Sequence, residues 1–383
     1  METALQMLCW VSLVALFYIY AGYPLLVGLL GRLRPGRIAR APITTTVSVV
    51  LVVHNEAARI GRKLDSLLAM EGAEQIVEVL VGSDGSTDDS AAITQSYPDP
   101  RVKWIPFADR RGKPSVINDL VSQARGEIVL LTDVRQDFAA DFLTATLPNF
   151  ADRTVGVVSG ELVLQADDAT TTAGEGIGLY WRYEKAIRNA ESRFRGVPGA
   201  TGACYLIRRE LFRPIHATTI LDDVAIPLQI VSHGFRCLFE CGAIAYDRPS
   251  TETRQEAIRK RRTIAGAAQL MVQYPQWLLP WRNPLWFEFV SHKLARLTSP
   301  VWLVMALVSS AMLWHHPLYA VLCIAQLGCY TAGVIGWTFQ SAGRRSSLFG
   351  PFLMFLTLNI TTAQALWDAL RSRYRVTWTK TAA

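Results

Sequence analysis

Three aspartates stand in contexts that could place carboxylates in a ligand site. Asp84 follows an apolar run in VLVGSDGSTDDS, Asp133 follows another in IVLLTDVRQDF, and Asp223 opens an amphipathic stretch in LDDVAIPLQIVSHGF. The two apolar runs predict buried strands, and open α/β sheets bind ligands outside the carboxyl ends of their strands. Carboxylates at such an edge can contact a sugar, a nucleotide or a metal ion.

Polar and basic side chains nearby extend the candidate site. Asn55 and Glu56 follow the run VSVVLVV, where they could contact a base or a ribose, although Asn-Glu also caps helices. Asp84 has the same alternative, because an aspartate before a helix accepts hydrogen bonds from the first turn. In RRGKPSVINDL, Lys113 and Asn118 stand at the start of a predicted helix, where cations suit a diphosphate. A solvated basic loop is the alternative.

Small residues precede a further apolar strand in GATGACYLIRREL, residues 199–211. A loop that contains Thr201 and Gly202 lets a ligand approach the backbone closely. A tight turn is the alternative. Both alternatives place the loop at one end of a strand.

Several other ligand signatures are missing. No G-x-G-x-x-G follows the first apolar run, and GKPS lacks the upstream glycine of a phosphate loop. No aromatic-interleaved basic stretch indicates a nucleic-acid partner. His233, Cys237 and Cys241 fall in or beside a predicted strand, where residues four apart lie about 13 Å from each other. We therefore interpret these cysteines as buried small hydrophobes rather than metal ligands.

The elements around these residues alternate between strand and helix. Nearly continuous apolar runs are typical of parallel strands covered on both faces, and the stretches between them have helical spacing of apolar residues. The alternation predicts an α/β domain over residues 43–275, with a doubly wound, Rossmann-like and mostly parallel sheet. The predicted strands are 47–53, 76–81, 127–132 and 156–164, and the predicted helices are 57–68, 115–124 and 176–194.

Composition favours a membrane protein, because half of the residues are hydrophobic and only 19% are charged. Residues 4–30 carry no charge and are long enough to cross about 30 Å of hydrocarbon. The arginines that follow predict a retained anchor with its basic side in the cytoplasm. The expected organisation is an anchor at 1–31, a cytoplasmic domain at 43–275, an interfacial amphipathic segment at 276–297, membrane segments within 298–370 and a basic tail at 371–383.

The C-terminal third predicts further spans at 299–314, 317–339 and 348–367. If all four segments cross, the basic tail lies outside, against the usual preference for basic flanks in the cytoplasm. The last segment is interrupted by Pro351 and Asn359, so it is the candidate for a re-entrant or interfacial position. For residues 276–297, a hydrophobic hairpin packed on the soluble domain is the alternative.

Taken in order, VVHNEA, GSDGSTDDS, RRGKPSVIN, LLTDVRQDF, LDDV and RKRRT resemble the motifs of the membrane-bound family-2 glycosyltransferases. Cellulose and hyaluronan synthases are distant relatives within that group. The resemblance covers about residues 45–275 and the flanking membrane segments. It implies a GT-A catalytic fold and a nucleotide-sugar donor.

The resemblance also implies roles for matching residues. Asp133 matches the first acid of a DxD motif, which positions a divalent metal, Mg²⁺ or Mn²⁺, on the donor diphosphate. Asp223 matches the general base that acts on the acceptor hydroxyl in inverting transfer, and Asp222 is its neighbour. This chemistry needs charge neutralisation at the diphosphate and a base at the hydroxyl. The resemblance implies that Asn55, Glu56 and Asp84 bind the donor nucleotide, and we add Lys113 and Asn118 to this group. Arg259 and Arg262 match the family element that steadies the leaving diphosphate.

Two positions depart from the family pattern. Arg135 replaces the second DxD acid, so either Asp133 holds the metal with the phosphates and another group, or Arg135 partly replaces the cation. Thr263 replaces a tryptophan that stacks on the acceptor in processive synthases. Trp181 and Tyr183 could supply an aromatic acceptor platform, or they could anchor their helix in the membrane interface. Thr201 and Gly202 complete the predicted acceptor site.

The expected function is inverting transfer from a nucleotide-sugar, UDP-linked by resemblance, to a lipid-linked or polysaccharide acceptor at the inner membrane. One alternative is a processive polysaccharide synthase, for which these few spans would need homo-oligomers or export partners to form a pore. Another alternative is an inactive binding or assembly subunit of a glycan-synthesis complex, which Arg135 motivates.

Overall fold

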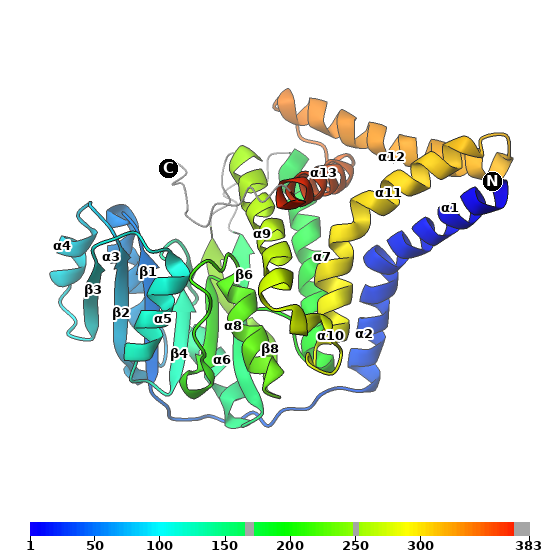
Figure 1. Ribbon diagram of the computed structural model, residues 1–383. Coiled ribbons are helices and arrows are strands. Elements are labelled where there is room, and N and C mark those ends of the chain that lie inside the picture. The colour runs from blue at the N-terminus through cyan, green and yellow to red at the C-terminus, as the bar shows by residue number, and fades with distance from the viewer. Residues whose placement is uncertain (165–171, 248–252, 371–383) are drawn as a thin grey trace.

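Strands and helices alternate along the chain and build one twisted sheet (Figure 1). The computed structural model describes residues 1–164, 172–247 and 253–370. Within these residues, eight strands form one sheet in the order β3-β2-β1-β4-β7-β6-β8-β5. The strands are β1 (Val47–Val53), β2 (Ile76–Asp84), β3 (Val102–Phe107), β4 (Ile128–Thr132), β5 (Asp137–Phe138), β6 (Val155–Leu164), β7 (Cys204–Arg208) and β8 (Arg236–Asp247).

The strands β3, β2, β1 and β4 run parallel, so their carboxyl ends share one edge of the sheet. Every residue of β1 is buried, because helices cover both faces and leave no side for water. β6 and β8 are also parallel to each other. β7 pairs antiparallel with β4 and β6, and β5 pairs antiparallel with β8. The structure therefore has the predicted α/β, mostly parallel sheet.

Hydrophobic cores lie on both faces of the sheet, because alternate residues of β1 point to opposite sides. Val50 and Val52 belong to one core, and Val49 and Leu51 belong to the other. The helices α5 (Lys113–Gln123) and α8 (Asp222–Ser232) cover the first core. The helices α3 (Ala57–Leu68) and α6 (Phe142–Thr146) cover the second core. The remaining helices of the domain are α4 (Ser90–Gln95), α7 (Thr172–Phe194) and α9 (Thr253–Gln273).

The segment after α9 packs largely onto the domain. It contains a 3-10 turn (Pro275–Leu278), the short helix α10 (Trp286–Glu288) and a π-helical turn (Phe289–Leu294). Trp277 and Leu285 are buried in the same core as α5 and α8, whereas Trp281 is 75% exposed. This packing corresponds to the alternative of a hydrophobic segment on the soluble domain, with Trp281 left for an interface.

Three described helical segments are long and apolar enough to cross a membrane: Glu2–Leu33, Trp286–Met312 and Pro317–Ser341. They include the predicted spans 4–30 and 317–339 and most of the span 299–314. The second ends in α11 (Ala295–Met312), and the third is α12 (Pro317–Ser341). The predicted span 348–367 corresponds to α13 (Gly350–Leu370), which is not among the three and packs against α7, α9 and α12 (Figure 1). The predicted tail 371–383 lies outside the described residues.

The first apolar helix bends in the middle. A π-helical turn, Tyr18–Gly22, separates α1 (Glu2–Phe17) from α2 (Tyr23–Leu33). Such a turn interrupts the regular hydrogen-bond ladder and is a common cause of a kink. α1 packs along α11, whereas α2 packs along α7 of the soluble domain. The second half of the predicted anchor is therefore attached to the domain.

A buried polar cluster, which we call the polar seam, joins α2, α7 and the residues around the start of α11. Tyr23 donates a hydrogen bond of 2.5 Å to Glu191, and His292 lies 2.8 Å from both Glu191 and Glu184. Arg296 donates to Glu184 over 2.6 Å. Burial alone would raise the pKa of Glu184, but His292 and Arg296 beside it hold the pKa well below its ordinary value. Because buried charges need partners, the seam fixes how α2 meets the domain.

Candidate active site

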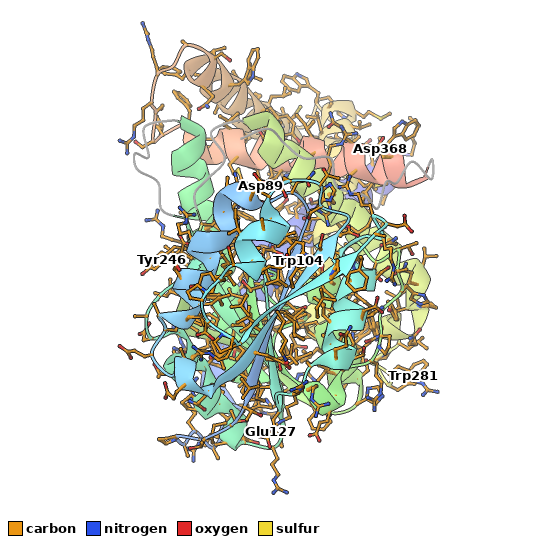
Figure 2. The ribbon with its side chains drawn as sticks, turned by 90° about the vertical axis from the view of Figure 1, so that its left-hand side faces the viewer. Asp89, Trp104, Glu127, Tyr246, Trp281 and Asp368 are labelled. Atoms are coloured by element: carbon orange, nitrogen blue, oxygen red, sulfur yellow. The ribbon has the colours of Figure 1, made fainter. Side chains whose placement is uncertain are left out.

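The carboxyl edge of the parallel strands faces α13. Figure 2 shows Asp89, in the loop after β2, on the same side of the molecule as Asp368 of α13. Glu127, which precedes β4, lies on the opposite side. Arg261 of α9 forms an ion pair with Asp368. The sheet edge that parallel α/β folds use for ligands thus lies on the same side of the molecule as α13.

Charged side chains from three elements meet at this edge. Lys113 Nζ, at the start of α5, lies 2.9 Å from Asp133 Oδ1 and 3.2 Å from Asp222 Oδ2. Asp133 directly follows β4, and Asp222 opens α8. Burial alone would lower the pKa of Lys113, but the carboxylates of Asp133 and Asp222 raise it above its ordinary value. Lys113 is therefore a permanent cation that links the two acidic motifs.

Asp223, the next residue of α8, has a carboxyl group suited to proton transfer. Burial and the neighbouring Asp222 raise the pKa of Asp223 to about 6. The backbone around it is held by a 2.7 Å hydrogen bond from the Ala200 amide to the Asp223 carbonyl. A β-carbon at Gly202 would lie only 3.1 Å from Asp223 Oδ2, so glycine leaves room for the carboxylate. A carboxyl group with this pKa accepts a proton near neutral pH.

The ends of β1 and β2 form the other half of the site. Asn55 adopts a positive φ of 56°, and its side-chain oxygen accepts a 2.7 Å hydrogen bond from the Thr87 amide. Asp84 accepts hydrogen bonds from the Arg111 and Gly112 amides. Glu56 precedes α3 and pairs with Arg59 at 3.0 Å. Asp84 and Lys113 line one narrow cavity of about 10 Å³, together with Val52, Val53, His54 and Arg110.

Asn118 does not face this cavity. Its side-chain amide donates to the Ile215 carbonyl over 2.8 Å and accepts from the Ile215 amide over 3.0 Å. Both polar ends of the side chain are thus used by the backbone of the loop that leads to α8. In the structure Asn118 anchors this loop, and its predicted nucleotide contact stays a prediction.

Arg135, the residue in place of the second DxD acid, is held by β8. Its guanidinium forms an ion pair with Asp247, whose side chain is 2% exposed. Gln136 donates to the same Asp247 carboxylate over 3.0 Å. A buried carboxylate of β8 thus binds Arg135, and a role for this arginine beside Asp133 stays a prediction.

Asp133 suits a divalent cation better than any other group in the loop after β4. Its side chain is 34% exposed, and its Oδ1 atom is the one that contacts Lys113. Mg²⁺ is commonly bound through one or two carboxylates together with substrate phosphates. The residues therefore fit a cation whose remaining ligands come from a donor diphosphate and water.

The predicted acceptor residues separate into two groups. Thr201 lies beside the Asp223 loop, where its hydroxyl accepts a 2.7 Å hydrogen bond from Arg188 and donates to the Gly160 carbonyl. Tyr183 donates to the Tyr20 carbonyl over 2.9 Å and packs on α2. Trp181 is partly exposed on the same helix. The contacts of Tyr183 match the anchoring alternative.

The predicted diphosphate arginines lie on α9. Arg262 is exposed there. Arg259 belongs to the same helix, but its side chain lies outside the described residues. The role of the two arginines at the diphosphate stays a prediction.

Lys63, which was not predicted from the sequence, holds the loop that carries Asp133. It is fully buried, and it donates to Thr132 Oγ1 over 2.9 Å and to the Gln136 carbonyl over 2.6 Å. These bonds hold both ends of the loop that carries Asp133. Burial lowers the pKa of Lys63 to about 7. The sequence feature that could have indicated this role is the position of Lys63 between Ile60 and Leu64, on the apolar face of the predicted helix.

Comparison with protein families identifies the chain. The model described as Glycosyl transferase family group 2 matches residues 132–337, which is more than half of the 383 residues. The chain belongs to this family. A second model, Glycosyl transferase family 2, matches residues 48–215. The family and the enzyme class predicted from the sequence are confirmed.

The glycosyltransferase is similar to curated proteins over most of its length. It is 23% identical to the beta-monoglucosyldiacylglycerol synthase of Synechocystis sp. over 369 residues, 88% of this chain and 74% of the relative. It is 21% identical to a poly-beta-1,6-N-acetyl-D-glucosamine synthase of Staphylococcus epidermidis over 333 residues, 86% of this chain and 75% of the relative. Both relatives are enzymes of glycan or glycolipid synthesis by name.

A solved structure confirms the fold. The glycosyltransferase matches the mannosyltransferase PcManGT from Pyrobaculum calidifontis, in complex with GDP-Man and Mn²⁺, with a TM-score of 0.72 and 21% identity. The match covers 96% of this chain and all of that chain. The GT-A-type sheet and the helices at both ends therefore recur together in another protein.

Proposed function

We propose that this glycosyltransferase transfers a sugar from a nucleotide-sugar donor to a membrane lipid or lipid-linked glycan, with inversion at the anomeric carbon. The observation that carries the proposal is the position of Asp223. Its carboxyl has a pKa of about 6, borders Gly202 and neighbours the Lys113–Asp133–Asp222 cluster. A base next to a phosphate-binding cation is what single-displacement transfer requires.

The donor would occupy the edge between β1, β2 and β4. Its nucleoside, uridine by family resemblance, would lie near Asn55, Glu56 and Asp84, and its diphosphate near Lys113. A bound Mg²⁺ or Mn²⁺ at Asp133 would supply positive charge for the leaving diphosphate. Arg259 and Arg262 of α9 are proposed to add to that charge.

Asp223 would remove the proton from the acceptor hydroxyl. As the hydroxyl oxygen forms its bond to the anomeric carbon, the bond to the diphosphate breaks, and the nucleoside diphosphate leaves with the electron pair. Asp222 contributes indirectly, because its negative charge raises the pKa of Asp223 and its carboxylate contacts Lys113. The product then has the opposite anomeric configuration to the donor.

A lipid or lipid-linked acceptor is supported by the side of the molecule on which the carboxyl edge lies. The carboxyl edge lies on the side of α13, and three described segments are apolar enough to cross a membrane. The glycolipid synthase from Synechocystis, similar over 88% of this chain, is named for a diacylglycerol product. We propose an inner-membrane location with the catalytic domain in the cytoplasm and Trp281 near the headgroups.

The test is nucleotide release by the detergent-purified protein with a panel of UDP-, GDP- and dTDP-sugars. Membrane lipid extract serves as acceptor, with Mg²⁺, with Mn²⁺ or with a chelator. Asp223→Asn should lower turnover by about 10²–10⁴-fold, the usual contribution of a general base. Asp65→Asn, an exposed substitution on α3, is the matched control and should keep full turnover.

Product analysis decides between the candidate functions. A glycolipid with one added sugar of inverted configuration supports the proposal. A polymer would favour a processive synthase, which the similarity to the Staphylococcus enzyme motivates. Full turnover by Asp223→Asn would remove the base assignment, and retained configuration would remove the single-displacement mechanism.

A further inference from the structure

The start of α1 and the turn between α11 and α12 meet at the end of the apolar helices that is farthest from the sheet (Figure 1). A small buried cluster of Cys9, Leu313 and Tyr319 packs these two segments together. The backbone of His316 accepts a hydrogen bond from Ala320 at the start of α12, which fixes the turn. Segments more than 300 residues apart are thus brought to one place.

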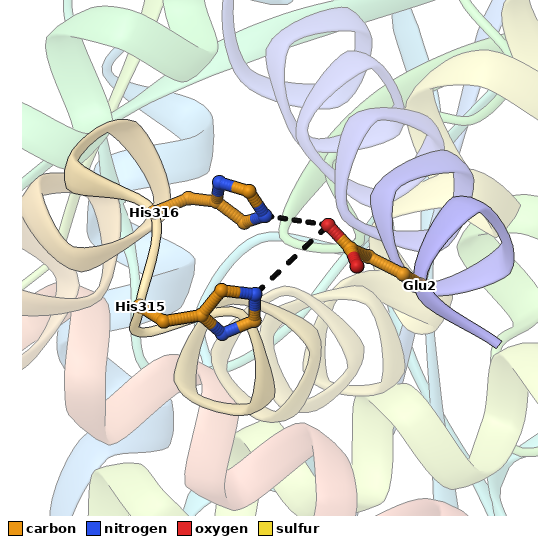
Figure 3. Close-up of side chains that lie close together, drawn as sticks. All are labelled: Glu2, His315 and His316. Atoms are coloured by element: carbon orange, nitrogen blue, oxygen red, sulfur yellow. Dashed lines mark hydrogen bonds and ion pairs between the residues drawn. The ribbon is translucent and has the colours of Figure 1, made fainter.

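Three side chains of residue types that can bind a metal gather at this contact (Figure 3): Glu2 from α1, and His315 and His316 from the turn. One ligand atom of each lies within 4.8 Å of the others. His316 Nε2 is 2.5 Å from Glu2 Oε1, and His315 Nε2 is 3.9 Å from the same oxygen. In the part of the chain that the structure describes, this is the one such group found.

The spacing is close to that of a tetrahedral zinc site. With bonds of about 2.0–2.1 Å, ligand atoms around tetrahedral Zn²⁺ stand about 3.3 Å apart. The two distances to Glu2 lie on either side of that value, so shifts of about 1 Å or less would satisfy both. The side chains are 41–62% exposed, which leaves them free to rotate.

We propose that Glu2, His315 and His316 bind one divalent transition-metal ion of the Zn²⁺ class, with water in the fourth position. Imidazole nitrogen favours Zn²⁺ over Mg²⁺ or Ca²⁺, which prefer oxygen ligands. The ion links the first turn of the chain to the α11–α12 turn. It lies at the opposite end of the molecule from the transferase site and takes no part in sugar transfer.

The test is zinc titration of the full-length protein in detergent by calorimetry, with a C-terminal affinity tag that contains no histidine. The wild type should bind one Zn²⁺ per chain. His315→Ala/His316→Ala and Glu2→Gln should bind it at least about tenfold more weakly, since even indirect partners of zinc ligands contribute that much. His233→Ala, an exposed histidine on the soluble domain, is the control and should bind as the wild type does.

Thermal unfolding supplies a second readout. Zn²⁺ should raise the Tm of the wild type and of the control but not of the double variant, whose Tm without zinc shows that it is folded. Equal zinc affinity in the wild type and double variant, as expected for binding at the exposed Cys241 or Cys329, would overturn the proposal. Absence of wild-type binding would overturn it as well.

Discussion

At the scale of single residues, Lys113 organises the charges of the active site. It contacts one carboxylate of each acidic motif, so Asp133 and Asp222 are neutralised by the same ammonium group. A cation that binds Asp133 must share that carboxylate with Lys113. Removal of this lysine would therefore alter the affinity for the metal and the charge around Asp223 together.

The pKa of Asp223 predicts how activity depends on pH. The proposed general base would work only as a carboxylate, and burial with the nearby Asp222 raises the pKa of Asp223 to about 6. The value of kcat/KM should therefore fall as the pH drops through about 6 and remain level above it. Removal of the neighbouring charge by Asp222→Asn should move this inflection to lower pH. A wild-type profile that is flat from pH 5 to pH 8 would contradict the assignment.

The Arg135–Asp247 pair predicts the result of restoring the family motif. Arg135→Asp would place a second carboxylate beside buried Asp247, and breaking a buried pair costs on the order of 3 kcal/mol. We expect a marked fall in Tm for this variant, with recovery in Arg135→Asp/Asp247→Asn. Thermal unfolding of both variants and of Asp247→Asn measures how strongly the effects of the two substitutions on stability depend on each other. A double variant with the same low Tm as Arg135→Asp would show that repulsion from Asp247 does not cause the loss of stability.

At the scale of elements, the loop before α8 decides where the base lies. Asn118 of α5 holds this loop through two hydrogen bonds to Ile215. Asn118→Ala leaves a backbone amide and carbonyl without these partners, at a cost of about 1–3 kcal/mol. We expect a lower Tm and a lower kcat with little change in the KM for donor. Ser122→Ala, on the exposed side of the same helix, should change neither quantity.

The sequence predicts best the strands that are buried on both faces of the sheet. β1 was predicted with its observed bounds because both of its faces are covered and every residue is apolar. β3 was missed, since VKWIPF lies at the edge of the sheet, carries Lys103 and Pro106, and is only partly buried. The rule for parallel strands placed Asp84 and Asp133 at one edge, and the family resemblance added Asp223. The structure brings Asp133 and Asp222, the neighbour of Asp223, together through Lys113.

The side-chain partners were less predictable than the elements. Asn118 occupies a position that suits a phosphate, but its partner is 97 residues away in a loop without periodic pattern. Likewise, nothing near Arg135 in the sequence indicates that Asp247 binds it. Such pairs depend on the packing of distant segments, which local spacing does not contain.

At the scale of the whole molecule, the polar seam attaches the apolar helices to the catalytic domain. Tyr23→Phe removes the hydroxyl that donates to buried Glu191, and hydrogen bonds to charged groups contribute about 1.5–3 kcal/mol. Tyr18→Phe is a matched control, because its hydroxyl contacts the neutral Ser291 and contributes about 0.5–1.5 kcal/mol. We expect the larger fall in Tm for Tyr23→Phe in detergent. Equal decreases in Tm for the two variants would show that the hydrogen bond to Glu191 stabilises the protein no more than the hydrogen bond to Ser291.

The bend at Tyr18–Gly22 has a consequence for the reach of the enzyme. Because α1 follows α11 while α2 is fixed to α7, the catalytic domain stands at a set height and tilt relative to the apolar helices. With the proposed membrane position of these helices, the distance between Asp223 and the bilayer surface would be fixed by the fold. Under the proposed function, lipid acceptors whose hydroxyls lie at the depth of Asp223 would react, whereas lipids with shorter or longer headgroups would not. Selection among lipids would thus follow from the geometry of a helix kink as much as from contacts with the sugar.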